Sequence, residues 1–168
     1  MKFLIKKLGR VFDIFEKAYA RTVQDEYRSR YDIDDSFRFN GKRIQIYGEG
    51  VAQFGANSYI GEGSTWQVYD GCKIVIGKGC KISHLVRAYT YSNDADADFS
   101  LAEIPKKKGD IVIGDYVWIG ANVMINPGIN IGTNSVIGAN SVVTKDIPPH
   151  SIYGGVPAKL IRVKRMSR

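Results

Sequence analysis

Residues 111–143 read IVIGDYVWIGANVMINPGINIGTNSVIGANSVV, and an aliphatic residue recurs there at every sixth position. The recurring residues are Ile113, Ile119, Ile125, Ile131, Ile137 and Val143. A period of six fits neither the 3.6 of a helix nor the 2 of a simple strand. It is typical of a chain that coils through three corners, with short flat strands between them. The stretch therefore predicts a β-solenoid in which each recurring residue points inward and stacks on the next turn.

The same period extends toward the N-terminus, with one interruption and one break. Two further triplets step by six: Phe54, Ile60, Trp66, Ile76, Ile82 and Ala88. The ten-residue step from Trp66 to Ile76 indicates a short insertion near residues 69–71. Residues 89–110 lose the period in a polar stretch, so we expect them to leave the coil as an excursion loop. Long loops thrown out of regular folds commonly carry function.

The 168 residues, of which 44% are hydrophobic, fit one domain. We expect the coil to occupy residues 44–162 and residues 163–168 to form a basic tail. The two cysteines, Cys72 and Cys80, are interpreted as buried thiols rather than a disulfide framework.

Residues 1–31 form a separate segment with apolar residues at helical spacing and lysines and arginines between them. This pattern predicts an amphipathic helix that caps the end of the coil, and weak contact with a membrane surface is the alternative. The apolar run at residues 3–5 is too short for a membrane span or a signal-peptide core. We therefore expect a cytoplasmic protein. If the helix contacts a membrane surface, we expect the protein to lie at the inner face of the membrane.

The net charge of +7 is concentrated in two places. One is the lysine run at residues 106–108, and the other is the C-terminal end, which carries Lys159, Arg162, Lys164, Arg165 and Arg168. Neither cluster has a recognition-helix or RNA-binding aromatic pattern beside it, so nucleic acid is not an expected partner. Two interpretations of these basic clusters remain: a solvated tail, or a binding site for a phosphate-rich cofactor.

The motifs VWIG, INPG, VIGA, VVTKDIPP and GVPAK, all within residues 111–162, resemble those of the hexapeptide-repeat acyltransferases. The similarity is greatest to the galactoside and maltose O-acetyltransferases and the sugar acetyltransferases of polysaccharide gene clusters. The resemblance implies an all-β fold, the left-handed parallel β-helix, assembled as a homotrimer with acetyl-CoA in the groove between adjacent coils. It implies no metal, and two histidines are too few for the three-histidine zinc site of the related carbonic anhydrases.

The resemblance also implies the residues that would hold acetyl-CoA. Ala121 and Ala139 would offer backbone groups along the pantetheine arm, and Thr144 and Lys145 would lie near the adenosine. The remaining expected contacts are Lys159 and Arg162 at the phosphates and Trp118 as a wall at the thioester end. Cations suit the phosphates because CoA carries several negative charges.

The catalytic position departs from the family pattern. The family places a histidine, acting as general base, on the loop that aligns here with residues 89–110, and the alignment puts that position at Asn93. An amide cannot accept a proton near neutral pH. A shift of one residue makes Asp94 the candidate, with an unperturbed pKa of about 3.9. His84, expected at a corner of the coil, is the third candidate for a catalytic role.

Three functions fit this reading. The first is acetyl transfer from acetyl-CoA to a sugar hydroxyl in a cell-surface polysaccharide or its precursor. The second is N-acetylation of an amino sugar, often nucleotide-linked, since an amine demands less of a base. The third is a catalytically degenerate trimeric scaffold. In either enzyme, Trp66, Gln67 and Asp70 near the insertion are expected to face the acceptor.

Overall fold

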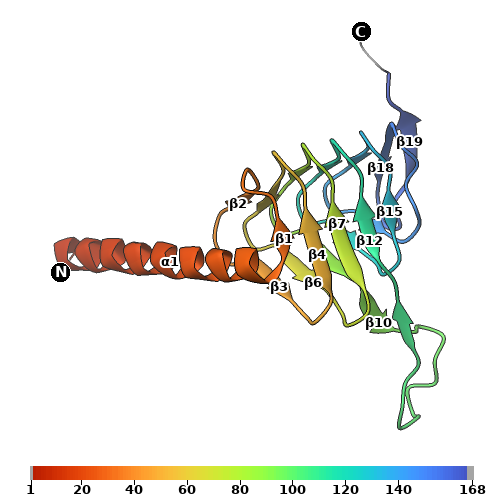
Figure 1. Cartoon of the computed structure of the whole chain (residues 1–168), viewed down its shortest axis with the longest axis horizontal. Helices are drawn as coiled ribbons and strands as arrows, with labels where there is room; N and C mark the ends of the chain where they lie inside the picture. Colours follow the sequence, from red (N-terminus) through yellow and green to blue (C-terminus); the bar gives the residue numbers. More distant parts are fainter. Residues whose placement is uncertain (1, 166–168) are drawn as a thin grey trace.

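The computed structural model describes residues 2–165, and the side chains of residues 5–165. It shows a parallel β-helix with three flat faces, preceded by one long helix, α1 (Lys2–Arg30) (Figure 1). Face A consists of β1 (Asp32–Ile33), β4 (Val51–Phe54), β7 (Lys73–Ile76), β12 (Ile111–Ile113) and β15 (Asn130–Ile131). Face C consists of β3 (Gln45–Tyr47), β6 (Thr65–Gln67), β9 (Arg87–Tyr89), β14 (Met124–Ile125) and β17 (Val142–Val143). Face B consists of β2 (Arg38–Asn40), β5 (Tyr59–Gly61), β8 (Lys81–Ile82), β13 (Trp118–Ile119), β16 (Val136–Ile137), β18 (Ser151–Gly154) and β19 (Lys159–Val163).

The six-residue period places one inward residue on each face in every turn. On face A, Phe54 is in register with Ile76, and Ile76 with Ile113. All the recurring residues predicted from the sequence are buried. Burying one such aliphatic side chain contributes roughly 1.5–3 kcal/mol. The stacked inward rows therefore form the core, and the three-faced solenoid expected from the sequence is confirmed.

Buried serines join neighbouring turns through hydrogen bonds inside the coil. Ser58 Oγ donates to Gly77 O at 2.7 Å and accepts from Cys80 N at 2.9 Å. Ser141 Oγ bonds in the same manner with the turn at Gly138 and Gly155. Each small hydroxyl satisfies backbone groups that the corner leaves unpaired, which is why a polar residue is tolerated at an inward position.

The corners are named AB, BC and CA after the faces that they join. At corner BC, Asn122 and Asn140 have φ of 56° and 59°, in the left-handed region that asparagine tolerates. Leu85 adopts φ 59° at the same corner, where a bulky side chain costs on the order of 1–3 kcal/mol. Turns also approach closely here, since a Cβ at Gly120 would lie 2.6 Å from Ala139 N. This spacing explains the glycine in each VWIG-like motif.

The N-terminal end of the coil is closed by aromatic side chains. Phe37 packs against Phe39 and Phe54 with ring centroids 5.4 and 5.0 Å apart, and Tyr27 of α1 packs on Phe39. The Arg28 guanidinium holds the C-terminal end of α1 against the coil by donating hydrogen bonds to Asp34 O and Phe37 O. Only the last turns of α1 take part in this cap.

The expected cap role of the whole segment 1–31 is therefore corrected. The helix projects beyond the first turn of the coil (Figure 1), and its apolar side chains from Ile5 to Tyr19 are exposed. The spacing of the apolar residues predicted a cap because it shows that one face of the helix is apolar. It does not show whether the coil or another surface covers that face.

A hairpin leaves the coil after β9, as expected for the excursion. It pairs β10 (Tyr91–Asn93) antiparallel with β11 (Lys106–Lys108), and it extends away from the faces (Figure 1). At the other end, β19 pairs antiparallel with β18 and closes the coil. Of the basic tail, Lys164 bonds to Asn134 Oδ1 at 2.6 Å, and residues 166–168, including Arg168, lie outside the described residues.

Cys72 and Cys80 are buried and free, which agrees with their interpretation as thiols. Burial raises the pKa of the Cys80 thiol, so this group is kept protonated. Within residues 2–165, no helix is both long enough and apolar enough to cross a membrane.

Candidate functional site

Corner BC aligns three of the predicted site residues on successive turns. Asn122 N donates to His84 O at 3.1 Å, and Asn140 N donates to Ala121 O at 2.9 Å. His84, Ala121 and Ala139 therefore form one row along the axis of the coil. Ala121 and Ala139 follow Gly120 and Gly138, which keep this edge narrow. A long, thin ligand could lie along the row against exposed backbone.

An open cavity of about 570 Å³ lies beside His84 in that row. Its lining includes Tyr59, Glu62 and Leu85, and the His84 side chain is exposed. Glu62 belongs to the preceding turn, because Leu85 N donates to Glu62 O at 2.9 Å. A phenol, a carboxylate and an imidazole thus border one cavity at the end of the Ala121–Ala139 row.

Face B supplies three further predicted residues next to corner BC. Trp118 is 54% exposed and points outward from β13, in register with Lys81 and Val136. Lys159 and Arg162 lie exposed on β19, and Lys159 pairs with Gly154 at the edge of the last turn. These cations extend the same side of the molecule that carries the alanine row.

Thr144 and Lys145 lie elsewhere, at corner CA. They follow β17, the last strand of face C, and both are exposed. Face C therefore separates them from the Ala121–Ala139 row within one chain. The structure brings together only part of the predicted cofactor set.

The hairpin holds the first two catalytic candidates, also at corner CA. Asn93 is in register with Lys106, whose ammonium donates to Asn93 Oδ1. Asp94 N donates to Pro105 O at 2.9 Å, and Asp94 Oδ1 accepts from Asp96 N at 3.1 Å. The Asn93 and Asp94 side chains therefore stabilise the hairpin itself, and neither lies in the row of His84.

An aromatic stack anchors the hairpin to the coil. The rings of Tyr69 and Tyr91 are parallel within 6°, with centroids 4.1 Å apart. Lys108 Nζ lies 4.7 Å from the Tyr69 centroid, and Lys106 Nζ lies 5.6 Å from that of Tyr91. Cations over aromatic faces stabilise such contacts. The six-residue period does not predict this stack, although a tyrosine in the insertion (Tyr69) and one in the excursion (Tyr91) were its signal.

The three residues predicted to face the acceptor differ in how deeply they are buried. Trp66 is fully buried in the row with Ile46 and Ala88, and its ring packs near Phe54. Its proposed contact with the acceptor is therefore corrected: the six-residue period makes position 66 an inward one. Gln67 and Asp70 remain near the base of the hairpin, with Gln67 beside Tyr89 in register. Gln67 Oε1 is buried and has no hydrogen-bond partner among the described residues.

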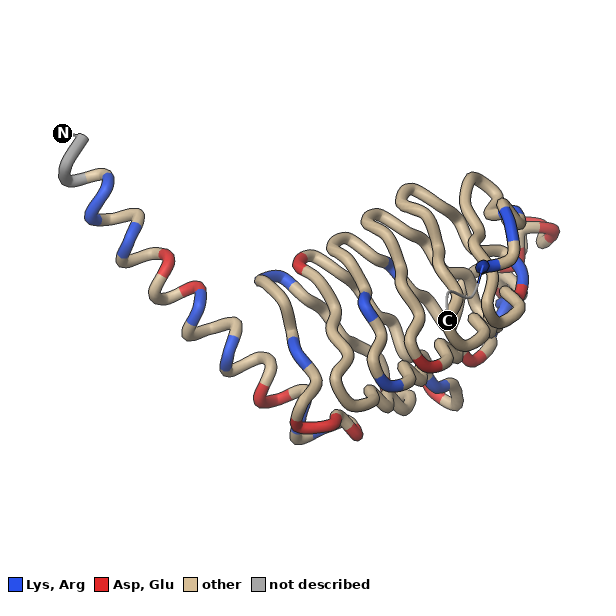
Figure 2. The backbone as a smooth tube through the Cα atoms, turned by 90° about the horizontal axis from the view of Figure 1, so that it is seen from above, with Lys and Arg blue, Asp and Glu red and all other residues tan. Residues whose placement is uncertain are grey.

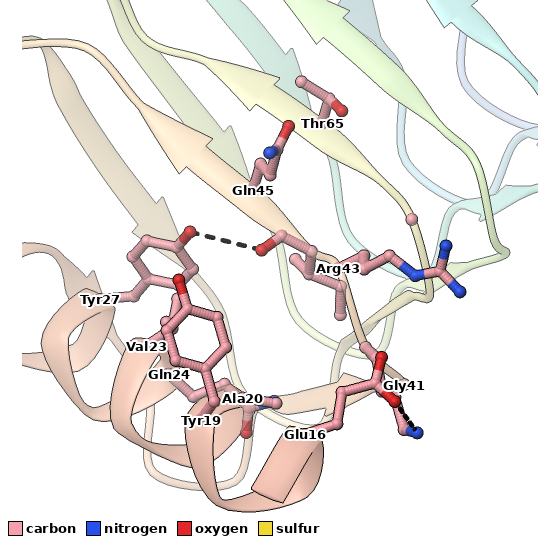
Figure 3. Close-up of a pocket in the computed structure, with 13 residues that line it drawn as sticks. Glu16, Tyr19, Ala20, Val23, Gln24, Tyr27, Gly41, Arg43, Gln45 and Thr65 are labelled. Carbon is pink, nitrogen blue, oxygen red and sulfur yellow. Dashed lines mark hydrogen bonds and ion pairs between the residues drawn. The ribbon is translucent and has the colours of Figure 1, made fainter. Parts of the chain in front are cut away.

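A cavity of about 590 Å³ between α1 and the coil was not predicted (Figure 3). Tyr19, Gln24 and Tyr27 border it from the helix, and Gln45 and Thr65 border it from face C. Tyr27 Oη donates to Ile44 O at 3.3 Å across one side. No local signal marks this cavity, because it depends on the angle at which the helix leaves the coil.

His150 lies at corner AB, where its Nδ1 is 3.2 Å from Asn134 Nδ2, and this contact is structural. Across residues 2–165, no group of three or more His, Cys, Asp or Glu side chains could hold a metal ion.

Residues 110–145 match the family described as "Bacterial transferase hexapeptide (six repeats)". The galactoside O-acetyltransferase of Escherichia coli (strain K12) is 64% identical over 52 residues, which are 31% of this chain and 26% of that protein. The predicted acetyltransferase SACOL2570 of Staphylococcus aureus (strain COL) is 36% identical over 169 residues, covering 96% of this chain and 82% of that protein. The chain spans only part of the length of the first three curated relatives, from 26% to 57%.

Solved structures show the same fold. The hexapeptide-repeat acetyltransferase VCA0836 of Vibrio cholerae, complexed with acetyl-CoA, has a TM-score of 0.68 at 28% identity, covering 83% of this chain and 74% of that one. The maltose O-acetyltransferase of Clostridium difficile 630 has a TM-score of 0.62 at 30% identity, covering 91% of this chain and 88% of that one.

The Tyr69–Tyr91 stack predicts the effect of a single substitution on the hairpin. Replacing Tyr91 by Ala should loosen the hairpin, because such aromatic pairs contribute about 0.5–1.5 kcal/mol beyond buried area. Amide hydrogen exchange across residues 91–108 should accelerate roughly two- to tenfold, with the exchange of face A unchanged. Phe99→Ala, at the exposed tip, is the matched control. Equal exchange in the two variants would show that the stack does not hold the hairpin.

Proposed function

The chain belongs to the hexapeptide-repeat transferase family, and on that premise we propose that it transfers an acetyl group from acetyl-CoA to an acceptor. The observation that carries the proposal is the row of Ala121 and Ala139 at corner BC, with Trp118 and the cations of β19 beside it. The row offers backbone to a thin pantetheine arm, and Lys159 and Arg162 offer positive charge to phosphates. Structural relatives bind acetyl-CoA or CoA.

The reaction balances without a further reagent. The acceptor oxygen or nitrogen attacks the thioester carbonyl, a bond from that atom to the acetyl carbon forms, and the carbon–sulfur bond breaks. A base takes the proton of the acceptor, and CoA leaves with its sulfur protonated. Holding donor and acceptor together supplies much of the rate of such a transfer.

We assign the base to His84 rather than to the hairpin. Asn93 is an amide already bonded to Lys106, and Asp94 is bonded to the backbone of its own turn. His84 lies in the row of Ala121 and Ala139 and borders the adjacent cavity. An imidazole can both take up and release a proton near neutral pH, which suits a general base.

The acceptor that we propose is a sugar hydroxyl in a cell-surface polysaccharide or its precursor. Its support is similarity to a galactoside and a maltose O-acetyltransferase. Gln67 and Asp70, at the base of the hairpin, are the proposed acceptor contacts. The exposed Asp70 carboxylate could accept a hydrogen bond from a sugar hydroxyl.

The site is proposed to form between copies of the chain in a homotrimer. Thr144, Lys145 and the hairpin lie at corner CA, whereas Ala121, Ala139 and His84 lie at corner BC. One cofactor can contact both sets when corner CA of one copy faces corner BC of another. Light scattering should then give three times 18.7 kDa, about 56 kDa. A mass of one chain at assay concentrations would contradict the shared site.

Binding of CoA tests the cofactor residues. Lys159→Ala combined with Arg162→Ala should weaken CoA binding on the order of tenfold to a hundredfold, because two charge-assisted phosphate contacts are lost. Added salt should weaken binding to the parent protein as well. The control, Lys17→Ala with Arg21→Ala on α1, removes the same charge and should bind CoA like the parent. Calorimetry that finds equal affinity in both double variants would refute the assignment of Lys159 and Arg162.

Activity tests the base. His84→Ala should lower acetyl transfer to a hydroxyl acceptor by roughly 10²–10⁴-fold without abolishing CoA binding. Asp94→Asn should lower it far less, and Asn93→His should raise it only if the hairpin reaches the acceptor. Release of free CoA, assayed on hydroxyl and amino sugars, is the measurement.

Two outcomes of that assay would overturn the assignment. Loss of activity in Asp94→Asn with full activity in His84→Ala would move the base to the hairpin. Transfer to amino sugars alone would replace the O-acetyl acceptor by an amine, and CoA binding with no transfer to either acceptor would leave a scaffold.

A further inference from the structure

Helix α1 carries an exposed apolar stripe that the coil does not cover. Its members lie three and four residues apart and are each 60–72% exposed: Ile5, Leu8, Phe12, Phe15 and Tyr19. This spacing puts them on one side of the helix. An exposed stripe with two phenylalanines and a tyrosine is unusual on a free surface and marks a contact site.

The C-terminal part of α1, from Glu16 to Tyr27, faces the coil. Val23 and Tyr27 border the cavity against face C, and Glu16 and Asp13 reach Lys42. Figure 2 shows the helix diverging from the coil toward its N-terminus. Tyr19 borders the cavity at the point of divergence, whereas the four earlier members of the stripe do not line it.

The charges around the stripe are positive. Lys6, Arg10 and Lys17 are exposed along the same turns, and the first turn contains no acid (Figure 2). The two acids between residues 5 and 19, Asp13 and Glu16, form ion pairs with Lys42, with Asp13 Oδ1 3.5 Å from its Nζ. Lys42 balances one of these two negative charges, and residues 5–19 carry four basic residues against the two acids, so this segment is basic and apolar together.

A helix bundle with other copies fits these residues less well. Ile5, Leu8, Phe12, Phe15 and Tyr19 would occupy its seam, and the next two seam positions are Thr22 and Glu26. The seam thus lasts about two heptads, whereas stable coiled coils need three or four. A bundle would also bring the cations of each helix close together.

We propose that residues 5–19 of α1 bind the surface of an anionic lipid bilayer. The helix lies in the plane of the interface, with the stripe buried among headgroups and upper acyl chains, and with the lysines and arginine near lipid phosphates. Aromatic side chains favour that depth. The proposal does not rest on acetyl transfer, because none of these residues belongs to the proposed acetyl-transfer site.

The test is co-sedimentation of the full chain with vesicles. The parent should pellet with vesicles of phosphatidylcholine containing phosphatidylglycerol and remain in the supernatant with phosphatidylcholine alone. Phe12→Glu with Phe15→Glu should abolish pelleting. The matched control, Phe99→Glu with Leu101→Glu, adds the same charge at two exposed apolar residues of the hairpin and should pellet like the parent.

A second variant separates charge from apolarity. Lys6→Gln with Arg10→Gln and Lys17→Gln should weaken binding on the order of a hundredfold, because each cation near an anionic surface gives about a fivefold gain. The oligomeric mass and CoA affinity of all variants, measured in parallel, should equal those of the parent. Parental pelleting of the Phe12, Phe15 variant would overturn the proposal. If the parent does not bind the vesicles and the Phe12, Phe15 variant has a lower oligomeric mass than the parent, the stripe would instead contact a second copy of the chain.

Discussion

The structure depends on stacking one buried residue directly over another from turn to turn. Strands of two to five residues have too few hydrogen bonds to persist alone, so each turn is stable only against its neighbours. Phe54, Ile76 and Ile113 illustrate the constraint, since they are in register on face A and all buried. The inward positions are therefore restricted to residues that pack in the core. Functional residues can vary at the corners, at the outward positions and in the segments that leave the coil.

The corners show how that constraint shapes a site. At corner BC, close approach of turns requires Gly120 beside Ala139 and left-handed residues at Asn122 and Asn140. Exposed backbone results along a narrow edge, which is the surface proposed for pantetheine. His84 shares the edge because it occupies the corner position of an earlier turn, next to the strained Leu85.

The two segments outside the coil are attached in different ways. The hairpin is anchored at its base by the stack of Tyr69 and Tyr91, with lysines over both rings. Helix α1 is held at its C-terminal end by Tyr27 and Arg28. Nearer its middle, Glu16 forms an ion pair with Lys42 of the coil. The hairpin thus has a fixed base at corner CA, where the proposed site between copies requires it, whereas the helix presents an uncovered surface.

The sequence by itself determined the coil, its breaks and its inward residues, because burial at a fixed period is written directly in residue type. It also predicted, by resemblance, which residues would bind the cofactor. Only the tertiary structure decided that Trp66 is a core residue, that α1 leaves its stripe exposed, and that the predicted cofactor residues divide between two corners. These features depend on which corner a position occupies and on the angle of a helix. Both follow from contacts between distant turns, which no local pattern of residues encodes.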